Sequence, residues 1–292
     1  MKKAKYLLSA ATLGAMAFLG ACGDEDSKSS NADKDLGKIN LAYVEWDTEV
    51  ASTHVVAQVL EDIGYDVETT PLDNAIMWEA VSTGEADAMV AGWLPGTHAS
   101  QLEKYGDNLV DLGPNLEGAK IGLVVPTYMD VDSIEDLSSE AGAVITGIEP
   151  GGGIMSATET ALDSYPNLDS WSLLPSSSGA MTVALDQAIK NEEEIVVTGW
   201  SPHWKFITYD LKYLEDPKGI FGVDENIHTF VRENLETDEP EAYKVLDAFH
   251  WTSEDVEEVM LEINGGTNPK EAAINWIKAN EELVNEWKAA IE

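Results

Sequence analysis

The sequence predicts an α/β protein with two parallel-sheet lobes joined by a two-crossing hinge. Short apolar strands alternate with helical segments in two successive stretches of the chain, which is typical of parallel sheets covered by helices. The chain has 292 residues, of which 44% are hydrophobic, enough for two cores. A late strand returns to the first lobe, so we expect this lobe to contain residues 39–126 and 225–292, and the second lobe residues 127–224.

The first residues have the pattern of a targeting segment followed by a tether. Three lysines precede an apolar stretch at 7–19, and the sequence LGAC, ending at Cys22, looks like a lipobox. This stretch is too short to span a bilayer, so we prefer a lipoprotein signal peptide at 1–21, with lipidation at Cys22, to a membrane helix or a buried thiol. Residues 22–38 are polar and lack aromatics, which predicts a flexible tether.

The first lobe begins with a strand–helix alternation. Strands are predicted at 39–44, 65–69, 86–92 and 120–125, with helices at 50–63 and 75–81. Pro126 ends the last of these strands, because proline cannot continue a central ladder.

The second lobe repeats this alternation, and helices complete the chain. Strands are predicted at 143–148, 172–174 and 194–198, with helices at 154–162 and 180–189. The strand expected to return to the first lobe is 226–231, and the C-terminal helices are 240–249, 253–263 and 269–291.

Composition and spacing argue against several classes of function. Lys and Arg total 17 against 54 Asp and Glu, a net charge of −37, which makes nucleic acid a poor partner. A single cysteine excludes disulfides and cysteine-based zinc sites. The five histidines show no HExxH or HxH spacing, and no GxSxG elbow is present, so neither a metal site nor a catalytic centre is indicated.

Three of the nine tryptophans share a position relative to predicted strands. Trp46, Trp93 and Trp200 each close an apolar strand and precede turn residues, and the last two lie in a repeated Gly-Trp-x-Pro sequence. Trp251 and Trp276 lie within helical patterns and are expected in the core. Because ligands of open α/β sheets bind at the carboxyl ends of strands, we expect the first three to project into a crevice between the lobes.

Three aromatic faces suit a quaternary ammonium group. Such a group cannot donate hydrogen bonds, but its charge is attracted to each π face by about 0.5–2 kcal/mol. A sugar-stacking platform is the rival use of tryptophan and would also need several polar groups to bind hydroxyls. Ordinary core packing is the third alternative.

A glycine-rich turn, EPGGGI at 149–154, lies between a predicted strand and a predicted helix. Its glycines allow the N–H groups of a helix N-terminus to approach an anion, and a carboxylate is the natural guest. The turn lacks the spacing and lysine of a P-loop, and a plain tight turn is the alternative. His98 could donate to the same carboxylate, unless it is only a surface residue of its loop.

The motifs together resemble one family. In order, the chain carries INLAYVEWDTEVAST, MVAGWLPGTH, KIGLVVPTYM, TGIEPGGGIM and VVTGWSPHW after its lipobox. From Lys38 to the C-terminus the sequence resembles the substrate-binding lipoproteins of glycine betaine ABC transporters. The resemblance implies the type II periplasmic-binding-protein fold, also called a Venus flytrap. It also implies a cage around a trimethylammonium group, formed by Trp46, Trp93 and Trp200, and a carboxylate clamp formed by Gly153, Ile154 and His98.

Some features depart from the family pattern or add to it. Glu149 stands where some relatives carry the aspartate of a DPG turn, which should leave the backbone clamp intact. Some relatives arrange the two halves of the chain in the opposite order. His203 and Trp204 also match the family, and we expect them to pack in the wall or hinge.

The resemblance implies a lipid-anchored receptor on the extracytoplasmic face of the cell membrane. It would bind glycine betaine or a close analogue by hinge closure and deliver it to the permease and ATPase of an ABC importer for osmoprotection. We expect a monomer without catalytic activity, cofactor, metal or nucleic acid. The alternatives are a choline, carnitine or proline betaine receptor, a zinc receptor using His98 and His203, and a surface enzyme or adhesin.

Overall fold

The strands of the first predicted alternation and those of the second belong to one sheet in the structure, a computed structural model that describes residues 35–291. The predicted signal peptide, Cys22 and most of the predicted tether lie outside the described residues. No helix in the described part of the chain has the length and apolarity needed to cross a bilayer.

Within residues 35–291 the strands follow the order β2-β1-β3-β9-β4-β7-β5-β6, and β8 pairs with β4 off this path. Their bounds are β1 (Gly37–Tyr43), β2 (Tyr65–Pro71), β3 (Ala88–Leu94), β4 (Leu109–Pro126), β5 (Val144–Thr146), β6 (Ser172–Leu174), β7 (Val196–Ser201), β8 (Leu211–Tyr213) and β9 (Glu225–Arg232). Parallel pairing is confirmed for β1 with β2 and β3, and for β5 with β6 and β7. In contrast, β9 runs antiparallel to β3, and β4 runs antiparallel to its partners β9, β7 and β8.

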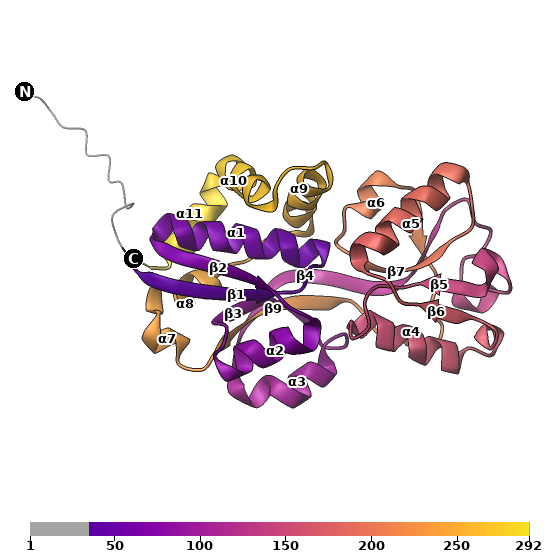
Figure 1. Ribbon diagram of the computed structural model, residues 1–292, viewed down its shortest axis with the longest axis horizontal. Helices are drawn as coiled ribbons and strands as arrows, with labels where there is room; N and C mark the ends of the chain where they lie inside the picture. The colour runs from indigo at the N-terminus through magenta and orange to yellow at the C-terminus, as the bar shows by residue number, and fades with distance from the viewer. Residues whose placement is uncertain (1–34, 292) are drawn as a thin grey trace, which may run out of the picture. The chain divides into compact units, whose positions relative to one another are not determined.

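Strand β4 connects two parts of the sheet, as Figure 1 shows. Its residues 109–119 pair with β9, and its residues 120–126 pair with β7 and β8. Within this one connected sheet, we call β1, β2, β3, β9 and the first part of β4 the first sheet. The second part of β4 with β5, β6, β7 and β8 is called the second sheet. The return strand predicted at 226–231 corresponds to β9, which pairs with β3 in the first sheet.

The helices begin and end close to the predicted positions in most of the chain. They are α1 (Asp47–Ile63), α2 (Asn74–Thr83), α3 (Ala99–Tyr105), α4 (Gly153–Ser164), α5 (Ser178–Asn191), α6 (Lys205–Thr208), α7 (Leu235–Asp238), α8 (Pro240–Ala248), α9 (Ser253–Asn264), α10 (Pro269–Ala279) and α11 (Glu281–Ala289). The first α/β unit is the first sheet with α1–α3 and α7–α11, and the second α/β unit is the second sheet with α4–α6.

The single helix predicted at 269–291 is wrong. The chain leaves helical geometry at Asn280, which has φ −120° and ψ 37°, so α10 ends and α11 begins there. The Asn280 side chain and its backbone N–H both donate to the carbonyl of Trp276 and so cap the end of α10.

Aromatic side chains fill the core beneath these helices. Trp251 and Trp276 are buried, as predicted, and their rings meet edge to face at 5.5 Å. Trp276 also stacks on Trp287, at 6.0 Å between centroids. This packing fixes the C-terminal helices against α1, whose own N-terminus follows Trp46.

Candidate ligand-binding site

A cavity lies where several strands end and helices begin; together with the open space at its mouth it contains about 320 Å³ not occupied by atoms. Five of the predicted site residues line it: Trp46, Trp93, Trp200, Gly153 and Ile154. Five further residues that were not predicted also line it: Glu49, Thr97, Ile121, Ile148 and Gly152. The two α/β units both contribute to the wall, so the structure brings together residues separated by more than a hundred positions in the chain.

The three tryptophans of the predicted cage come from equivalent places in the fold. Trp46 follows β1 and precedes α1, while Trp93 and Trp200 lie near the carboxyl ends of β3 and β7. All three side chains are buried, with exposed fractions of 7%, 3% and 4%. The three rings therefore lie together at one cavity, close to the carboxyl ends of their strands.

Each indole N–H of the cage donates to a side chain of the protein. The acceptors are Glu149 for Trp46, Glu49 for Trp93 at 2.7 Å and Thr48 for Trp200 at 2.9 Å. The first and third bonds join the two α/β units. Because the indole N–H is the only polar group of tryptophan, what remains for the cavity is aromatic surface.

Two other side chains cover faces of the cage rings. The His98 ring stacks on Trp46, with centroids 5.9 Å apart and planes at 19°. The Lys205 ammonium lies 4.2 Å from the Trp200 ring centroid. The Trp46 and Trp200 rings are each covered on one face, so the other face of each ring remains to line the cavity.

The glycine-rich turn places the N-terminus of α4 in the cavity wall. Gly153 and Ile154 are the first residues of α4, and N–H groups in the first turn of a helix have no intrahelical acceptor. A Cβ added at Gly153 would lie 2.2 Å from the Thr97 carbonyl oxygen. Only glycine therefore allows this close approach between the turn and the loop after β3.

His98 does not line the cavity but lies fully buried behind Trp46. Its Nδ1 accepts the backbone N–H of Trp93 at 3.0 Å, so in the neutral ring Nε2 carries the proton. Nε2 is buried and makes no hydrogen bond of normal geometry in the described residues. Burial lowers the pKa of His98 to about 3, although the Ala91 backbone acts in the opposite sense, so the ring is neutral at neutral pH.

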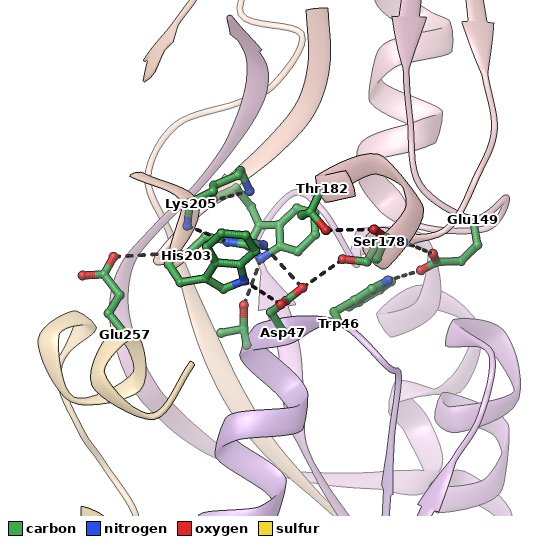
Figure 2. A network of polar contacts seen from close by, with 12 residues as sticks. Trp46, Asp47, Glu149, Ser178, Thr182, His203, Lys205 and Glu257 are labelled. Atoms are coloured by element: carbon green, nitrogen blue, oxygen red, sulfur yellow. Dashed lines mark hydrogen bonds and ion pairs between the residues drawn. The ribbon is translucent and has the colours of Figure 1, made fainter. Parts of the chain in front are cut away.

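The Trp46–Glu149 bond is part of a larger polar network that joins the two α/β units (Figure 2). Asp47, at the start of α1, accepts from the Trp204 indole at 2.7 Å and from the Ser178 hydroxyl at 3.0 Å. His203 Nε2 lies 3.5 Å from the same carboxylate. His203 and Trp204 thus pack beside the cage rather than in it, in keeping with the expected packing role.

Burial and hydrogen bonding decide the charges in this network. Burial opposes ionisation of Asp47, but the contacts with His203, Trp204 and Ser178 outweigh it and hold the pKa of Asp47 below its usual value. Burial, aided by Lys205, lowers the pKa of His203 to about 4 against the opposing effect of Asp47. Burial also holds the pKa of Lys205 well below its usual value.

Besides the apolar and glycine positions of the cavity wall, sequence reasoning missed the carboxylates that accept from the indoles. Glu49 follows Trp46 by three positions, one turn along α1, and this spacing was the only available signal for it. Glu149 was taken for a neutral replacement in a turn, yet its carboxylate accepts from both Trp46 and the Ser178 backbone. Among residues 35–291 no three His, Cys, Asp or Glu side chains gather as a metal site would require.

Comparison with known proteins identifies the fold class and the family. A crystal structure of lactococcal OpuAC in its closed-liganded conformation, complexed with glycine betaine, is 58% identical and superimposes with a TM-score of 0.84, covering 86% of this chain and 99% of that chain. The glycine betaine, L-proline ABC transporter binding protein (ProX) from Borrelia burgdorferi is 34% identical, with a TM-score of 0.83 over 87% and 100%. These likenesses confirm the type II periplasmic-binding-protein fold class.

The curated proteins include a further relative. The glycine betaine/carnitine transport binding protein GbuC of Listeria monocytogenes serotype 1/2a (strain 10403S) is 50% identical over 167 residues, and the chain spans 56% of the length of that relative. Residues 37–279 match the family described as the substrate binding domain of ABC-type glycine betaine transport systems. This match extends over most of the chain, and the protein therefore belongs to that family.

Proposed function

We propose that this protein is a receptor that captures glycine betaine, or a close analogue, and delivers it to an ABC importer. Its family binds solutes for transport rather than transforming them. One observation carries the proposal: three buried indoles whose N–H groups are all bonded within the protein line one cavity together with a helix N-terminus. Aromatic surface attracts a trimethylammonium group, and free N–H groups attract a carboxylate.

In the proposed complex the cage surrounds the methylated nitrogen and the clamp binds the carboxylate. The N–H groups of Gly153 and Ile154 donate to the carboxylate oxygens. His98 does not line the cavity in this structure, so it would donate its unpartnered Nε2 proton only after the wall around Trp46 rearranges on closure. Among the side chains that line the cavity, a primary ammonium would find one unpartnered buried acceptor, Glu49 Oε2, for three N–H groups. Its remaining donors would lose hydrogen bonds to water, so methylation is the feature that is recognised.

Carnitine and proline betaine share both groups with glycine betaine, and the name of the Listeria relative includes carnitine. Choline has the ammonium group but no carboxylate, so it would use the cage without the clamp. The clamp therefore distinguishes a betaine receptor from a choline receptor.

We further propose how the receptor is attached and how it moves. Lipidation of Cys22 would anchor the chain to the extracytoplasmic face of the membrane, and residues 22–38 would be the tether. Residues 39–126 with 225–292 would form one lobe and 127–224 the other, closing on the ligand. The hydrogen bonds that join the two α/β units, from Trp46 to Glu149 and from Trp204 to Asp47, support this mechanism.

Intrinsic tryptophan fluorescence of the purified protein, titrated with glycine betaine, choline and glycine in parallel, tests the proposal. Because three tryptophans line the cavity, we expect a saturable change with glycine betaine and none with glycine. An equal response to choline, which has no carboxylate, would contradict the proposed carboxylate clamp. No response to any of the three would contradict the proposed function.

A further inference from the structure

We propose that Glu49 is a counter-ion that makes the cavity select a positively charged ligand over a neutral ligand of the same shape. This inference rests on the proposed function and deepens it, because it assigns part of the selectivity to charge rather than to the fit of the cage. Glu49 lies in the cavity wall, but it is neither one of the three cage tryptophans nor one of the hydrogen-bond donors of the clamp.

Glu49 lies in the first turn of α1 and lines the cavity, with only 1% of its surface exposed. One carboxyl oxygen, Oε1, accepts the Trp93 indole N–H at 2.7 Å. The other, Oε2, is buried and has no hydrogen-bond partner in the described residues. A buried carboxylate oxygen without a donor is costly, and a cation in the same cavity removes much of that cost.

No ionised basic group of the described residues offsets the charge of Glu49 from inside the cavity wall. The charged groups that act on it are Asp47 on its own helix and Glu149 from the loop after β5, and both are acidic. His98, behind Trp46, is neutral because it is buried. Lys205 lies over the Trp200 ring, where burial disfavours its charged form. A ligand cation is therefore the natural partner of Glu49.

The same surroundings predict that binding of a cationic ligand is coupled to release of a proton from Glu49. Burial raises the pKa of Glu49 to about 8, against the bond from Trp93 and aided by Asp47 and Glu149. A large fraction of Glu49 is thus protonated at neutral pH without a cation nearby. A trimethylammonium group favours the ionised form, so binding of a cationic ligand at pH 7 releases a proton.

A purely structural role for Glu49 makes a different prediction. If Glu49 served only to hold Trp93 in place, the amide oxygen of glutamine could accept the same indole N–H. The Glu49→Gln variant would then behave like the wild type. Glu45→Gln is the matched control, because Glu45 is exposed, lies four positions away and does not line the cavity.

The test compares glycine betaine with 3,3-dimethylbutanoate, which has carbon in place of nitrogen and keeps the shape and the carboxylate. Isothermal titration calorimetry gives the Kd of both ligands for the wild type, Glu49→Gln and Glu45→Gln. We expect the preference for glycine betaine to fall by about tenfold or more in Glu49→Gln and to stay unchanged in Glu45→Gln. An unchanged preference in Glu49→Gln, or an equal loss for both ligands, would overturn the proposal.

A second measurement needs no variant. Binding enthalpies of glycine betaine to the wild type at pH 7, measured in phosphate and in Tris, give the number of protons released. We expect net release for glycine betaine and none for 3,3-dimethylbutanoate, and equal proton exchange for both ligands would contradict the counter-ion. If the wild type binds neither ligand, the proposed function fails and this inference fails with it, whereas binding without preference contradicts the counter-ion alone.

Discussion

Each tryptophan of the cage uses its one polar group to bond with the protein itself. The acceptors come from the two helix-entry segments that follow β1 and β5: Thr48, Glu49 and Glu149. These hydrogen bonds fix the edges of the rings. They also leave no indole N–H of the three without an acceptor, and a methylated ammonium group could not have supplied one. A ligand rich in hydroxyls would find few polar partners in this wall, which argues against the sugar-stacking alternative.

Substitution at Trp200 separates aromatic attraction from simple bulk. Trp200→Phe keeps a π face beside the ligand, whereas Trp200→Leu keeps only apolar volume. We expect the Leu variant to bind glycine betaine about tenfold more weakly than the Phe variant, corresponding to about 1–2 kcal/mol for one cation–π contact. Isothermal titration calorimetry of both variants checks this, and equal affinities would mean that the cage acts through shape alone.

The sequence predicted that Trp46, Trp93 and Trp200 would lie together, because all three follow apolar strands and strand ends meet in space. It could not predict the partners of the indoles. With 54 acidic residues in the chain, no single carboxylate stands out, and the role of Glu149 depends on a contact with Trp46 across 103 positions. His98 was predicted as a donor in the site, and its place behind Trp46 follows from long-range packing that no local pattern records.

At the scale of elements, the N-terminus of α4 contributes most to the proposed clamp. Its position depends on close contact between Gly153 and the Thr97 carbonyl, and the loop that carries Thr97 is itself held by Glu225 on β9. The Glu225 carboxylate accepts the backbone N–H groups of Gly96 and Thr97 at 2.6 and 2.7 Å. The proposed clamp therefore depends on close contact between α4 and the loop after β3, which a single added methyl group would disrupt.

Gly153→Ala tests this dependence. The added Cβ would lie 2.2 Å from the Thr97 carbonyl oxygen, so the loop or the helix must move. We expect the affinity for glycine betaine to fall by about tenfold or more, as measured by isothermal titration calorimetry. Gly179→Ala is the control, because a Cβ there meets no atom within 4 Å. Equal affinities of the two variants would show that the contact does not position the clamp.

Element boundaries were predictable where local patterns are regular. The helices α1, α4, α5 and α9 follow the predicted ranges within a few residues, helped by end signals such as the left-handed Gly64 and the Thr252–Asp255 capping box. The first part of β4, 109–119, was missed. Its pairing with β9 shifts register three times, around residues that include Gly113 and Pro114, so the alternation of a strand is absent from the sequence.

At the scale of the whole molecule, the two α/β units meet through buried polar groups beside the cage. Asp47 carries three contacts to the second unit and is held ionised by them. Contacts of this kind break together when two parts of a molecule separate, and they form together when the parts meet. Composition and alternation predicted two units, but which side chains would join them depends on the tertiary fold.

Buried neutral histidines should make the stability of the protein depend on pH. Burial lowers the pKa of His203 to about 4, while in the unfolded chain the pKa is about 6.5. Between these values the unfolded chain binds more protons, so the free energy of unfolding falls as the pH drops. We expect His203→Gln to reduce this loss by on the order of 3 kcal/mol.

Urea denaturation at pH 6.5, 5.5 and 4.5 measures this loss. His98 titrates in the same direction and is present in every variant, so comparison of variants isolates His203. The exposed His250→Gln is the control. Identical slopes in the wild type and His203→Gln would contradict the buried, neutral state assigned to His203.

A crystal structure of the protein with glycine betaine tests the central claim most directly. We expect the trimethylammonium nitrogen to lie among the rings of Trp46, Trp93 and Trp200, with the carboxylate oxygens at hydrogen-bond distance from the N–H groups of Gly153 and Ile154. A ligand bound outside this cavity, or bound with its carboxylate toward the three rings, would contradict the account.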